Sequence, residues 1–469
     1  MTDERLTGLT ADLAHSITAL GREPLNTRTQ QYVSCALLDH LAVGLFGSKQ
    51  DAIRRLVAAR LAGRAPAGRS PLYGRNDAAP ASEAAFMNAA AVHGFELDDL
   101  NETGGVHTSC VVISAALSAA AQAGSSGAEL VGAIVCGFEA MGEVGAASDS
   151  GDTAFHLTGT HGPIGAAAAA ARITGLDADG LESAWGLAAS FAGGVKAFQS
   201  GGGEVKRLHA ARGAEAGILA VDLVRHGFPG PTGALEATRG FFAAFGGPGW
   251  VRPVRRQDLV VEDTYLKPYS AVAASHPVID LVLAARAEHG LTADRVATVR
   301  VGLPLRRVGQ NSNPTPKDTM AVQYSTEATV AIALTGNPHD PQEFEFDRFN
   351  AGPARRFLPR VEIYGADEDQ LGSSGLAAMV TIQTTDGTVY ESAQQSLRMP
   401  ASLTDRRSAA LEKFTTLNPE VEEAALARLV AQVDGLSDLA SIDPLLSCLA
   451  EISASVARNS DANLTNVKS

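Results

Sequence analysis

The sequence is poor in cysteine, and its few cysteines are not arranged in pairs. Cys35, Cys110, Cys136 and Cys448 are scattered through apolar segments of a 469-residue chain, and no CxxC motif occurs. This pattern argues against a disulfide-stapled secreted domain and against a zinc site built on paired cysteines. We expect buried free thiols in a reducing compartment. Because the chain opens with a polar stretch instead of a signal peptide, we expect a cytoplasmic protein.

Positive charge is also scarce, with 38 Lys and Arg residues against 52 Asp and Glu residues and a formal net charge of −14. Proteins that bind nucleic acid carry a basic surface, so we expect no nucleic-acid partner. The charge-free segment 103–128 is rich in Gly, Ala and Ser and contains His107. That composition is typical of a buried helix and not of a membrane span, so we expect no membrane partner.

The motifs that announce a bound metal or cofactor are missing. The sequence contains no HExxH or HxxxH pair, no calcium-loop spacing, no dinucleotide fingerprint and no GxSxG. The triple glycine at 201–203 suggests a phosphate loop, but the order GxxxxGK[ST] is absent. We therefore predict no metal and no cofactor, which leaves acid–base chemistry by His, Lys, Asp or Glu held close together.

Helical periodicity dominates the first 250 residues, where many Ala and Gly positions would let helices approach closely. Between 259 and 402 the pattern alternates: "RVATVRVGL" and "PRVEIYG" predict strands, and a hairpin is predicted to turn at Asp386-Gly387. In the first strand, Val296 is predicted on the face opposite Val299 and Val301. Helical spacing returns over 403–469, which we expect to pack back on the first domain. The fold class is thus a mainly α multi-helix domain (1–258) with a smaller α+β domain (259–402).

The segment "AVHGFELDDLNETGGVHTSC" interrupts two Ala-rich helical stretches with a group of ionisable residues. Glu96, Asp98, Asp99 and His107 each cost desolvation free energy if they are buried without a partner. The segment is therefore either a solvated loop or a functional site.

Three further polar segments interrupt the apolar pattern. In "FHLTGTHGPIG", either Thr160 caps the Ala-rich helix that follows or the helix start binds an anion. "SGGGEVKRLHAARGAEAG" presents Lys206, His209 and Arg212 at a helix start, a suitable set for binding carboxylates. In "YLKPYS", the proline predicts extended geometry at Lys267.

Taken in order, these segments resemble the MmgE/PrpD family. Its pattern "D-xx-G-xxxx-G" is found from Asp39 to Gly47, and "NG-xx-H-xx-DFDD" followed by "HPS" corresponds to "NAAAVHGFELDD" and "HTS". The family's His-x-Thr with an Ala-rich helix, its "K-x-LH" and its "KPY" also recur in order. No single motif is specific, but the ordered set is.

The resemblance implies a helical domain built from both chain ends, a smaller α+β lid domain, a homodimer, and an interdomain site for a small polycarboxylate. Family members dehydrate 2-methylcitrate, decarboxylate cis-aconitate or epimerise iminodisuccinate. The catalytic positions that carry over are Glu96, His107, His156, Lys206 and Lys267. The substrate-binding residues predicted beside them are Asp98, Asp99, His209, Arg212 and Tyr324.

Departures from the family pattern bear on the activity. Leu100 stands where the family has Thr or Ser, Val272 where the decarboxylase has His, and Ala328 where decarboxylase and dehydratase have Tyr. These changes disfavour decarboxylation of cis-aconitate. We predict a dehydratase-like lyase that abstracts a proton α to a carboxylate, with an epimerase of an amino- or imino-dicarboxylate as the alternative. A non-catalytic scaffold is disfavoured because both lysines and both histidines are retained.

Overall fold

The computed structural model describes residues 8–22, 24–63, 67–148, 153–247, 250–251, 258–372 and 374–467. The chain forms two compact units. The first comprises Met1–Lys196, Glu204–Leu266 and Ser402–Ser469, and the second comprises Ala197–Gly203 and Lys267–Ala401. The sequence prediction placed the changes of domain after residues 258 and 402. The fold class is confirmed: a mainly helical unit and a smaller unit of mixed α and β structure.

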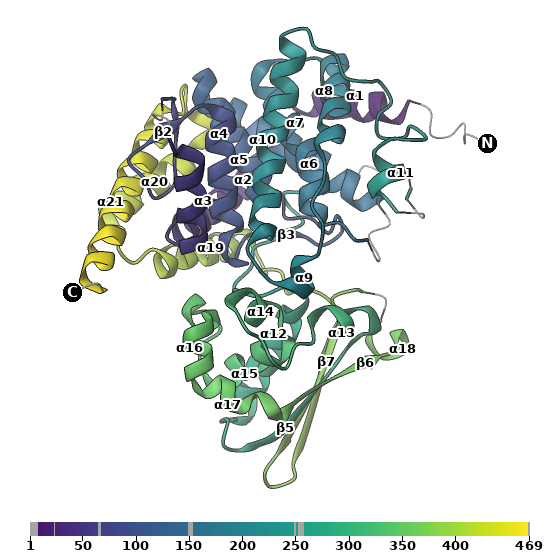
Figure 1. Ribbon diagram of the computed structural model, residues 1–469, viewed down its shortest axis with the longest axis vertical. Helices are drawn as coiled ribbons and strands as arrows, with labels where there is room; N and C mark the ends of the chain where they lie inside the picture. The colour runs from purple at the N-terminus through teal and green to yellow at the C-terminus, as the bar shows by residue number, and fades with distance from the viewer. Residues whose placement is uncertain are drawn as a thin grey trace. The chain divides into compact units, whose positions relative to one another are not determined.

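The first unit is built almost wholly of helices (Figure 1). Its α-helices are α1 (Leu9–Leu20), α2 (Thr27–Ser48), α3 (Asp51–Leu61), α4 (Ala81–Val92), α5 (Thr108–Ala123), α6 (Gly127–Ala147), α7 (Leu157–Thr174), α8 (Ala178–Phe191), α10 (Val205–Arg225), α11 (Phe241–Phe245), α19 (Leu403–Leu417), α20 (Glu423–Asp434) and α21 (Asp443–Val467). The 3₁₀ turns η2 (His93–Phe95) and η6 (Leu436–Asp438) and the two-residue strands β1 (Ser70–Pro71), β2 (Ala78–Ala79), β3 (Leu100–Asn101) and β4 (Thr264–Tyr265) complete it.

Glycines at helix contacts explain how this unit packs so closely. A Cβ added at Gly137 of α6 would lie 2.9 Å from the Gly165 carbonyl oxygen of α7, and one at Gly165 would lie 3.0 Å from the Gly137 oxygen. The two helices therefore touch backbone to backbone. Helix α6 is the one described helix long and apolar enough to cross a membrane, but 94% of its apolar window is buried inside the protein.

The chain's C-terminal segment completes the first unit. Of the yellow helices in Figure 1, α20 packs against α2 and α21 against β1, both of which come from the first quarter of the chain. Helix α19 packs against α2, where the Asn418 side chain donates to the Ala42 carbonyl over 2.9 Å. The core of this unit thus joins residues from both ends of the sequence.

The second unit contains a mixed four-stranded sheet in the order β6-β5-β7-β8. The strands are β5 (Val296–Pro304), β6 (Val361–Ala366), β7 (Ala378–Thr384) and β8 (Val389–Gln394), and β5 pairs parallel to β6 and antiparallel to β7. The helices are α9 (Phe198–Gly201), α12 (His276–His289), α13 (Leu305–Asn311), α14 (Thr319–Tyr324), α15 (Thr326–Thr335), α16 (Phe346–Ala351), α17 (Pro353–Phe357) and α18 (Glu368–Leu371), with 3₁₀ turns η3 (Ala273–Ser275), η4 (Pro341–Phe344) and η5 (Leu358–Arg360).

The strands and the hairpin predicted from alternation are confirmed, but the faces of β5 are not those predicted. Val296, Val299 and Val301 are all fully buried. The pairing of β5 with β7 shifts register between Val296 and Thr298. A bulge inserts one extra residue and reverses the alternation, so Val296 joins the same core as the other two valines.

The predicted start of α7 was wrong. Thr160 is not its N-cap, because the helix begins at Leu157 with His156 in the cap position and runs through Pro163. Thr160 lies inside the first turn and donates its hydroxyl to the Leu157 carbonyl over 3.2 Å. The helix begins early because the His156 carbonyl oxygen accepts from the Gly159 and Thr160 N–H groups over 2.9 and 3.2 Å, and Pro163 lies inside the helix although it lacks an N–H.

Close packing of the first unit yields a stability prediction. A Cβ added at Gly47 of α2 would lie 1.8 Å from the Ala91 carbonyl oxygen of α4. We expect Gly47→Ala to lower the free energy of unfolding by on the order of 3 kcal/mol or more, because the helix backbones must separate. Differential scanning calorimetry of the variant measures this loss.

Gly213→Ala is the matched control in the same unit. Its added Cβ would meet the Gly162 Cα at 3.4 Å, an ordinary contact. Alanine favours a helix over glycine by about 1 kcal/mol, so the melting temperature of this variant is expected to stay the same or rise. Equal melting temperatures for both variants would contradict the packing argument.

Candidate active site

The loop that follows α4 buries its three carboxylates. Glu96 is 1% exposed, and Asp98 and Asp99 are fully buried. Of the two alternatives that the sequence left open, the solvated loop is therefore excluded. Every one of these charges lies in a polar network that replaces its lost water, as buried charges require.

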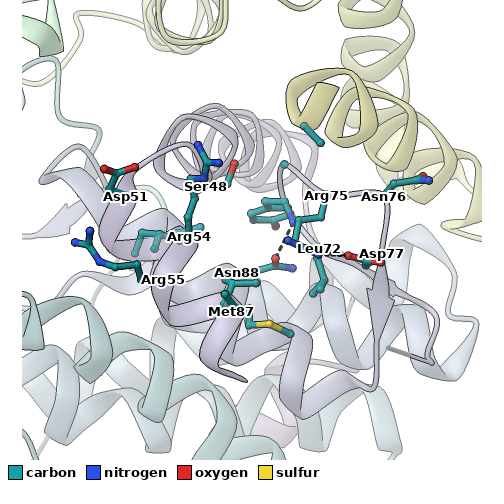
Figure 2. Close-up of a pocket in the computed structure, with 17 residues that line it drawn as sticks. Ser48, Asp51, Arg54, Arg55, Leu72, Arg75, Asn76, Asp77, Met87 and Asn88 are labelled. Carbon is teal, nitrogen blue, oxygen red and sulfur yellow. Dashed lines mark hydrogen bonds and ion pairs between the residues drawn. The ribbon is translucent and has the colours of Figure 1, made fainter. Parts of the chain in front are cut away.

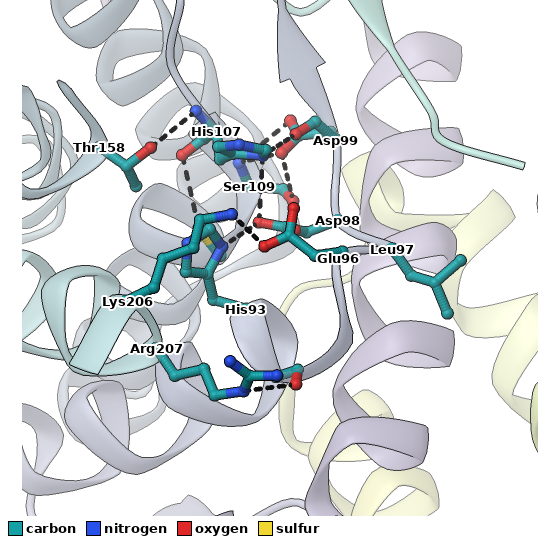
Figure 3. Close-up of polar contacts among 12 residues, drawn as sticks. His93, Glu96, Leu97, Asp98, Asp99, His107, Ser109, Thr158, Lys206 and Arg207 are labelled. Atoms are coloured by element: carbon teal, nitrogen blue, oxygen red, sulfur yellow. Dashed lines mark hydrogen bonds and ion pairs between the residues drawn. The ribbon is translucent and has the colours of Figure 1, made fainter. Parts of the chain in front are cut away.

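Glu96, in the loop after η2, forms an ion pair with Lys206 of α10 (Figure 3). Lys206 comes from the first turn of α10 and is itself 1% exposed. Glu96 is the one non-glycine residue in the described part of the chain with a positive φ, at 57°. This left-handed backbone is strained for a residue with a Cβ. The strain turns the Glu96 carboxylate toward Lys206.

Asp98 lies between two imidazole rings. Its Oδ2 atom is 2.6 Å from His93 Nδ1 and 3.4 Å from His107 Nδ1. His93 was not among the predicted site residues, although it is the histidine of the "H-xx-DFDD" pattern. It is 1% exposed, whereas His107 and His156 keep 9% and 8%. His93 therefore holds Asp98, while the other two rings retain an exposed edge.

Asp99 holds the start of α5. Its carboxylate accepts from the Thr108 hydroxyl at 2.6 Å, from the Ser109 N–H at 2.9 Å and from the Ser109 hydroxyl at 2.9 Å. Burial raises the pKa of Asp99 to about 7, against the lowering effect of these donors. Its carboxylate contacts are thus those of a helix cap, and a role in substrate binding stays a prediction.

The hydrogen bond of His107 fixes its tautomer. His107 Nδ1 is 2.6 Å from the Asp99 carbonyl oxygen. A carbonyl oxygen only accepts, so Nδ1 carries the proton. In the neutral ring the lone pair then lies on Nε2. The backbone N–H of His107 donates to the Thr158 hydroxyl of α7 over 3.2 Å, and this bond holds the main chain from which the ring extends.

His156, at the start of α7, and His209, on α10, form a second pair of imidazole rings in the cluster. Their Nδ1 atoms are 3.2 Å apart, so one donates and the other accepts. Burial, followed by the positive charge of Lys206, lowers the pKa of His156 well below its usual value. Burial lowers the pKa of His209 to about 4. Both rings are therefore neutral near pH 7 and able to accept a proton.

Three predicted site residues remain: Arg212 in the first unit, and Lys267 and Tyr324 in the second. Arg212 is not brought to this cluster: its side chain is 61% exposed and pairs with Glu215, which also pairs with Arg60. Arg212 is six residues after Lys206 on α10, whereas residues that share a face of a helix are three, four or seven apart, so the two side chains point in different directions. Lys267 and Tyr324 belong to the second unit, where Lys267 is buried and the Tyr324 ring meets Phe198 edge to face at 6.2 Å. Their predicted roles stay predictions.

His93, Asp98 and Cys110 are close enough to hold a metal ion, with ligand atoms within 4.8 Å of one another. Two observations disfavour this. Burial and the nearby carboxylates raise the pKa of the Cys110 thiol well above its usual value, so it stays protonated and donates to the His107 carbonyl at 3.4 Å. The charge of Lys206 lies beside the group. The three residues fit a hydrogen-bonded network better than a metal site.

A separate cavity of about 630 Å³ opens between α3, the segment 72–77 and the side of α4 (Figure 2). None of the predicted site residues lines it. It contains three arginines, but Arg75 is already paired with Asp77 and Arg55 is exposed to solvent. Two of its three arginines are thus already paired or facing solvent.

The chain belongs to the MmgE/PrpD family. The MmgE/PrpD N-terminal domain matches residues 11–252 and the C-terminal domain matches residues 269–436. A cis-aconitate decarboxylase of Aspergillus terreus is 25% identical over 478 residues, which cover 94% of this chain and 96% of that protein. The cis-aconitate decarboxylase of Mus musculus is 24% identical and covers 87% of each chain. A cis-aconitate decarboxylase-like protein of Aspergillus oryzae is 32% identical over 245 residues, half of each chain.

The buried histidines predict sensitivity to acid. Burial lowers the pKa values of five of them: that of His40 to about 3, those of His161 and His209 to about 4, and those of His93 and His156 below the usual value of a histidine. The unfolded chain takes up protons near pH 6.5 while the folded protein resists them, so stability is full above pH 6.5 and falls as the pH drops toward 4. Asp99 and Asp39, whose pKa values burial raises, oppose this as two groups against five. Thermal melting from pH 7.5 to 4.5 measures the loss.

His161→Gln isolates one histidine outside the loop, since its ring contacts Ser148 and Thr160. We expect the melting temperature of this variant to fall by less between pH 6.5 and pH 4.5 than that of the wild type. A wild-type melting temperature that stays flat over that range would contradict the assignment of neutral buried rings.

Proposed function

We propose that this protein is a lyase that acts on a small di- or tricarboxylate by removing a proton α to a carboxylate, with water as the leaving group. The observation that carries the proposal is the His107 ring, whose Nδ1 is bonded to the Asp99 carbonyl oxygen so that Nε2 is the atom left to accept a proton, beside the buried Lys206 (Figure 3). A base and a cation close together are what proton abstraction next to a carboxylate requires.

His107 suits the role of base by geometry. The Asp99 carbonyl holds its proton on Nδ1, and Asp98 lies 3.4 Å from the same atom. When Nε2 accepts the substrate proton, the ring becomes a cation that the Asp98 carboxylate stabilises. His156 is the second candidate for proton transfer, since its ring centroid is 6.3 Å from that of His107.

Lys206 suits the stabilisation of the intermediate. Loss of a proton α to a carboxylate leaves a dianionic, enolate-like species whose extra charge needs a nearby cation. In a buried site a cation acts through a low dielectric and is not screened by water. A bound polycarboxylate would also raise the pKa of the neutral histidines by its own negative charge, which would make them stronger bases while the substrate is present.

Decarboxylation of cis-aconitate is the second candidate, supported by the names of the relatives. Identities near 25% leave room for a change of reaction within the family. Ala328 does not decide between the candidates, because it lies in the hydrophobic core of the second unit. Leu100 in β3 and the half-buried Val272 still lack the polar groups expected of the decarboxylase. The relatives give no support to the epimerase alternative.

Incubation in D₂O with citrate, 2-methylcitrate and cis-aconitate, followed by proton NMR, tests the reaction. We expect an alkene signal from a hydroxy-tricarboxylate without release of CO₂, because the α-proton passes to His107, the C–O bond of the neighbouring hydroxyl breaks, and a protonated histidine of the site returns a proton so that the hydroxyl leaves as water. Formation of itaconate from cis-aconitate would instead establish the decarboxylase. Deuterium exchange without an alkene would show proton removal without elimination, and either result overturns dehydration.

His107→Gln in the same assay is expected to lower kcat/KM by about 10²-fold or more, the usual cost of losing a general base. His161→Gln is the matched control because it also replaces a buried histidine. The ring of His161 is hydrogen-bonded to Ser148 at the end of α6 and to Thr160 of α7, and neither is a predicted site residue. Equal activity of both variants would remove His107 from the mechanism.

A further inference from the structure

We propose that Lys413, on the C-terminal helix α19, is a positioning residue for the loop 93–99 that carries Glu96 and Asp98. It does not touch the histidine cluster in any contact described above. Its effect would pass through the backbone of Leu97, the residue between the two carboxylates. The inference rests on the proposed catalytic function of that loop.

Lys413 ties the loop to two helices at once. Its ammonium donates to the Leu97 carbonyl oxygen over 2.7 Å and to the Asp39 carboxylate of α2 over 2.7 Å. The side chains of Lys413 and Asp39 are 11% and 1% exposed. Charge-assisted hydrogen bonds in such a buried place are strong and directional. Through Lys413, the Leu97 peptide is therefore held at a fixed distance from Asp39 of α2.

Leu97 is the point where such a bond has most effect. Its neighbour Glu96 holds the strained φ of 57°, and its other neighbour Asp98 bridges His93 and His107. In Figure 3 the Leu97 side chain points away from the cluster while the carboxylates on either side point into it. Movement of the Leu97 peptide would thus displace both carboxylates together.

A second cation holds the other end of the same turn. Arg207, next to Lys206 on α10, donates its Nε–H to the Gly94 carbonyl over 2.8 Å. The strained turn is therefore held from one side by α10 and from the other by α19. Strained backbone persists only where the surrounding structure over-determines it, and Lys413 supplies the part of that restraint that comes from the C-terminal segment.

Asp39 makes the arrangement depend on Lys413. Burial raises the pKa of Asp39, and the charge of Lys413 acts against this rise. Without the lysine, the carboxyl would lose the partner that favours its ionised form. Both the anchor on α2 and the bond to Leu97 would then be lost through one substitution.

The chain offers a matched control in Lys49. Its ammonium donates to the Leu417 carbonyl over 2.9 Å and to Glu420 over 2.7 Å, so it also joins α2 to the end of α19. The bonds are of the same kind and connect the same pair of helices, but neither reaches the loop 93–99. Lys49→Met and Lys413→Met therefore both weaken the α2–α19 contact, and only the second releases Leu97.

Hydrogen–deuterium exchange of the full chain tests the inference without any substrate. We expect Lys413→Met to speed exchange in peptides covering 93–101 by about tenfold or more, because local opening becomes easier. Lys49→Met should leave those peptides unchanged. In the activity assay, Lys413→Met should lower kcat by about 10- to 100-fold, as small misplacements of catalytic groups do, and Lys413→Arg should recover part of it.

Each outcome decides something. Unchanged exchange at 93–101 in Lys413→Met, or equal acceleration in Lys49→Met, overturns the positioning role. Faster exchange with full activity would keep the restraint but remove the loop from catalysis, which contradicts the proposed function separately. If Lys413→Met does not fold, Asp39→Asn takes its place: it removes the charge that holds the Lys413 ammonium against the Leu97 carbonyl, so exchange between that of the wild type and that of a released loop is expected, and wild-type exchange would overturn the role.

Discussion

The buried ion pair between Glu96 and Lys206 is the interaction on which the rest of the site depends. Removing two charges from water costs several kcal/mol per ion, and their attraction repays this only with favourable geometry and further hydrogen bonds. Here that geometry is obtained with a left-handed backbone at Glu96. The restraints on Gly94 and Leu97 from Arg207 and Lys413 hold this backbone in place. The same pair also sets the electrostatics of the histidines, since Lys206 lowers the pKa values of His93, His156 and His209.

His156 and His209 are neutral rings beside Lys206, a cation that is paired with Glu96, and we infer that a bound polyanion would change their protonation. Without one, the rings resist protonation because burial and Lys206 both oppose a further positive charge. A di- or tricarboxylate would supply the negative charge that reverses this balance. The substrate itself would then prepare the base that acts on it. This coupling accounts for the choice of histidine over a permanently charged residue, because a histidine whose pKa the bound substrate raises back toward neutral can take up a proton and return it.

Much of this arrangement could be predicted from the sequence, because ordered motifs encode it locally. The buried carboxylates, His107, His156 and Lys206 all interrupt apolar helical patterns, where an ionisable residue needs a reason. Residues whose function depends on distant partners could not be found in this way. Lys413 lies 316 residues from Leu97, and nothing in the spacing of α19 announces that contact. Arg212 was misplaced because spacing on α10 does not reveal Glu215 as a competing partner. The faces of β5 depended on a bulge in pairing with β7.

The central claim is that His107 is held as a neutral base with its proton on Nδ1 and its lone pair on Nε2, next to a charged Lys206. Neutron diffraction from deuterium-exchanged crystals at pH 7 measures this directly. The account predicts a deuteron on His107 Nδ1 pointing at the Asp99 carbonyl, none on Nε2, and three on Lys206 Nζ. A deuteron on His107 Nε2, or a neutral Lys206, would contradict it.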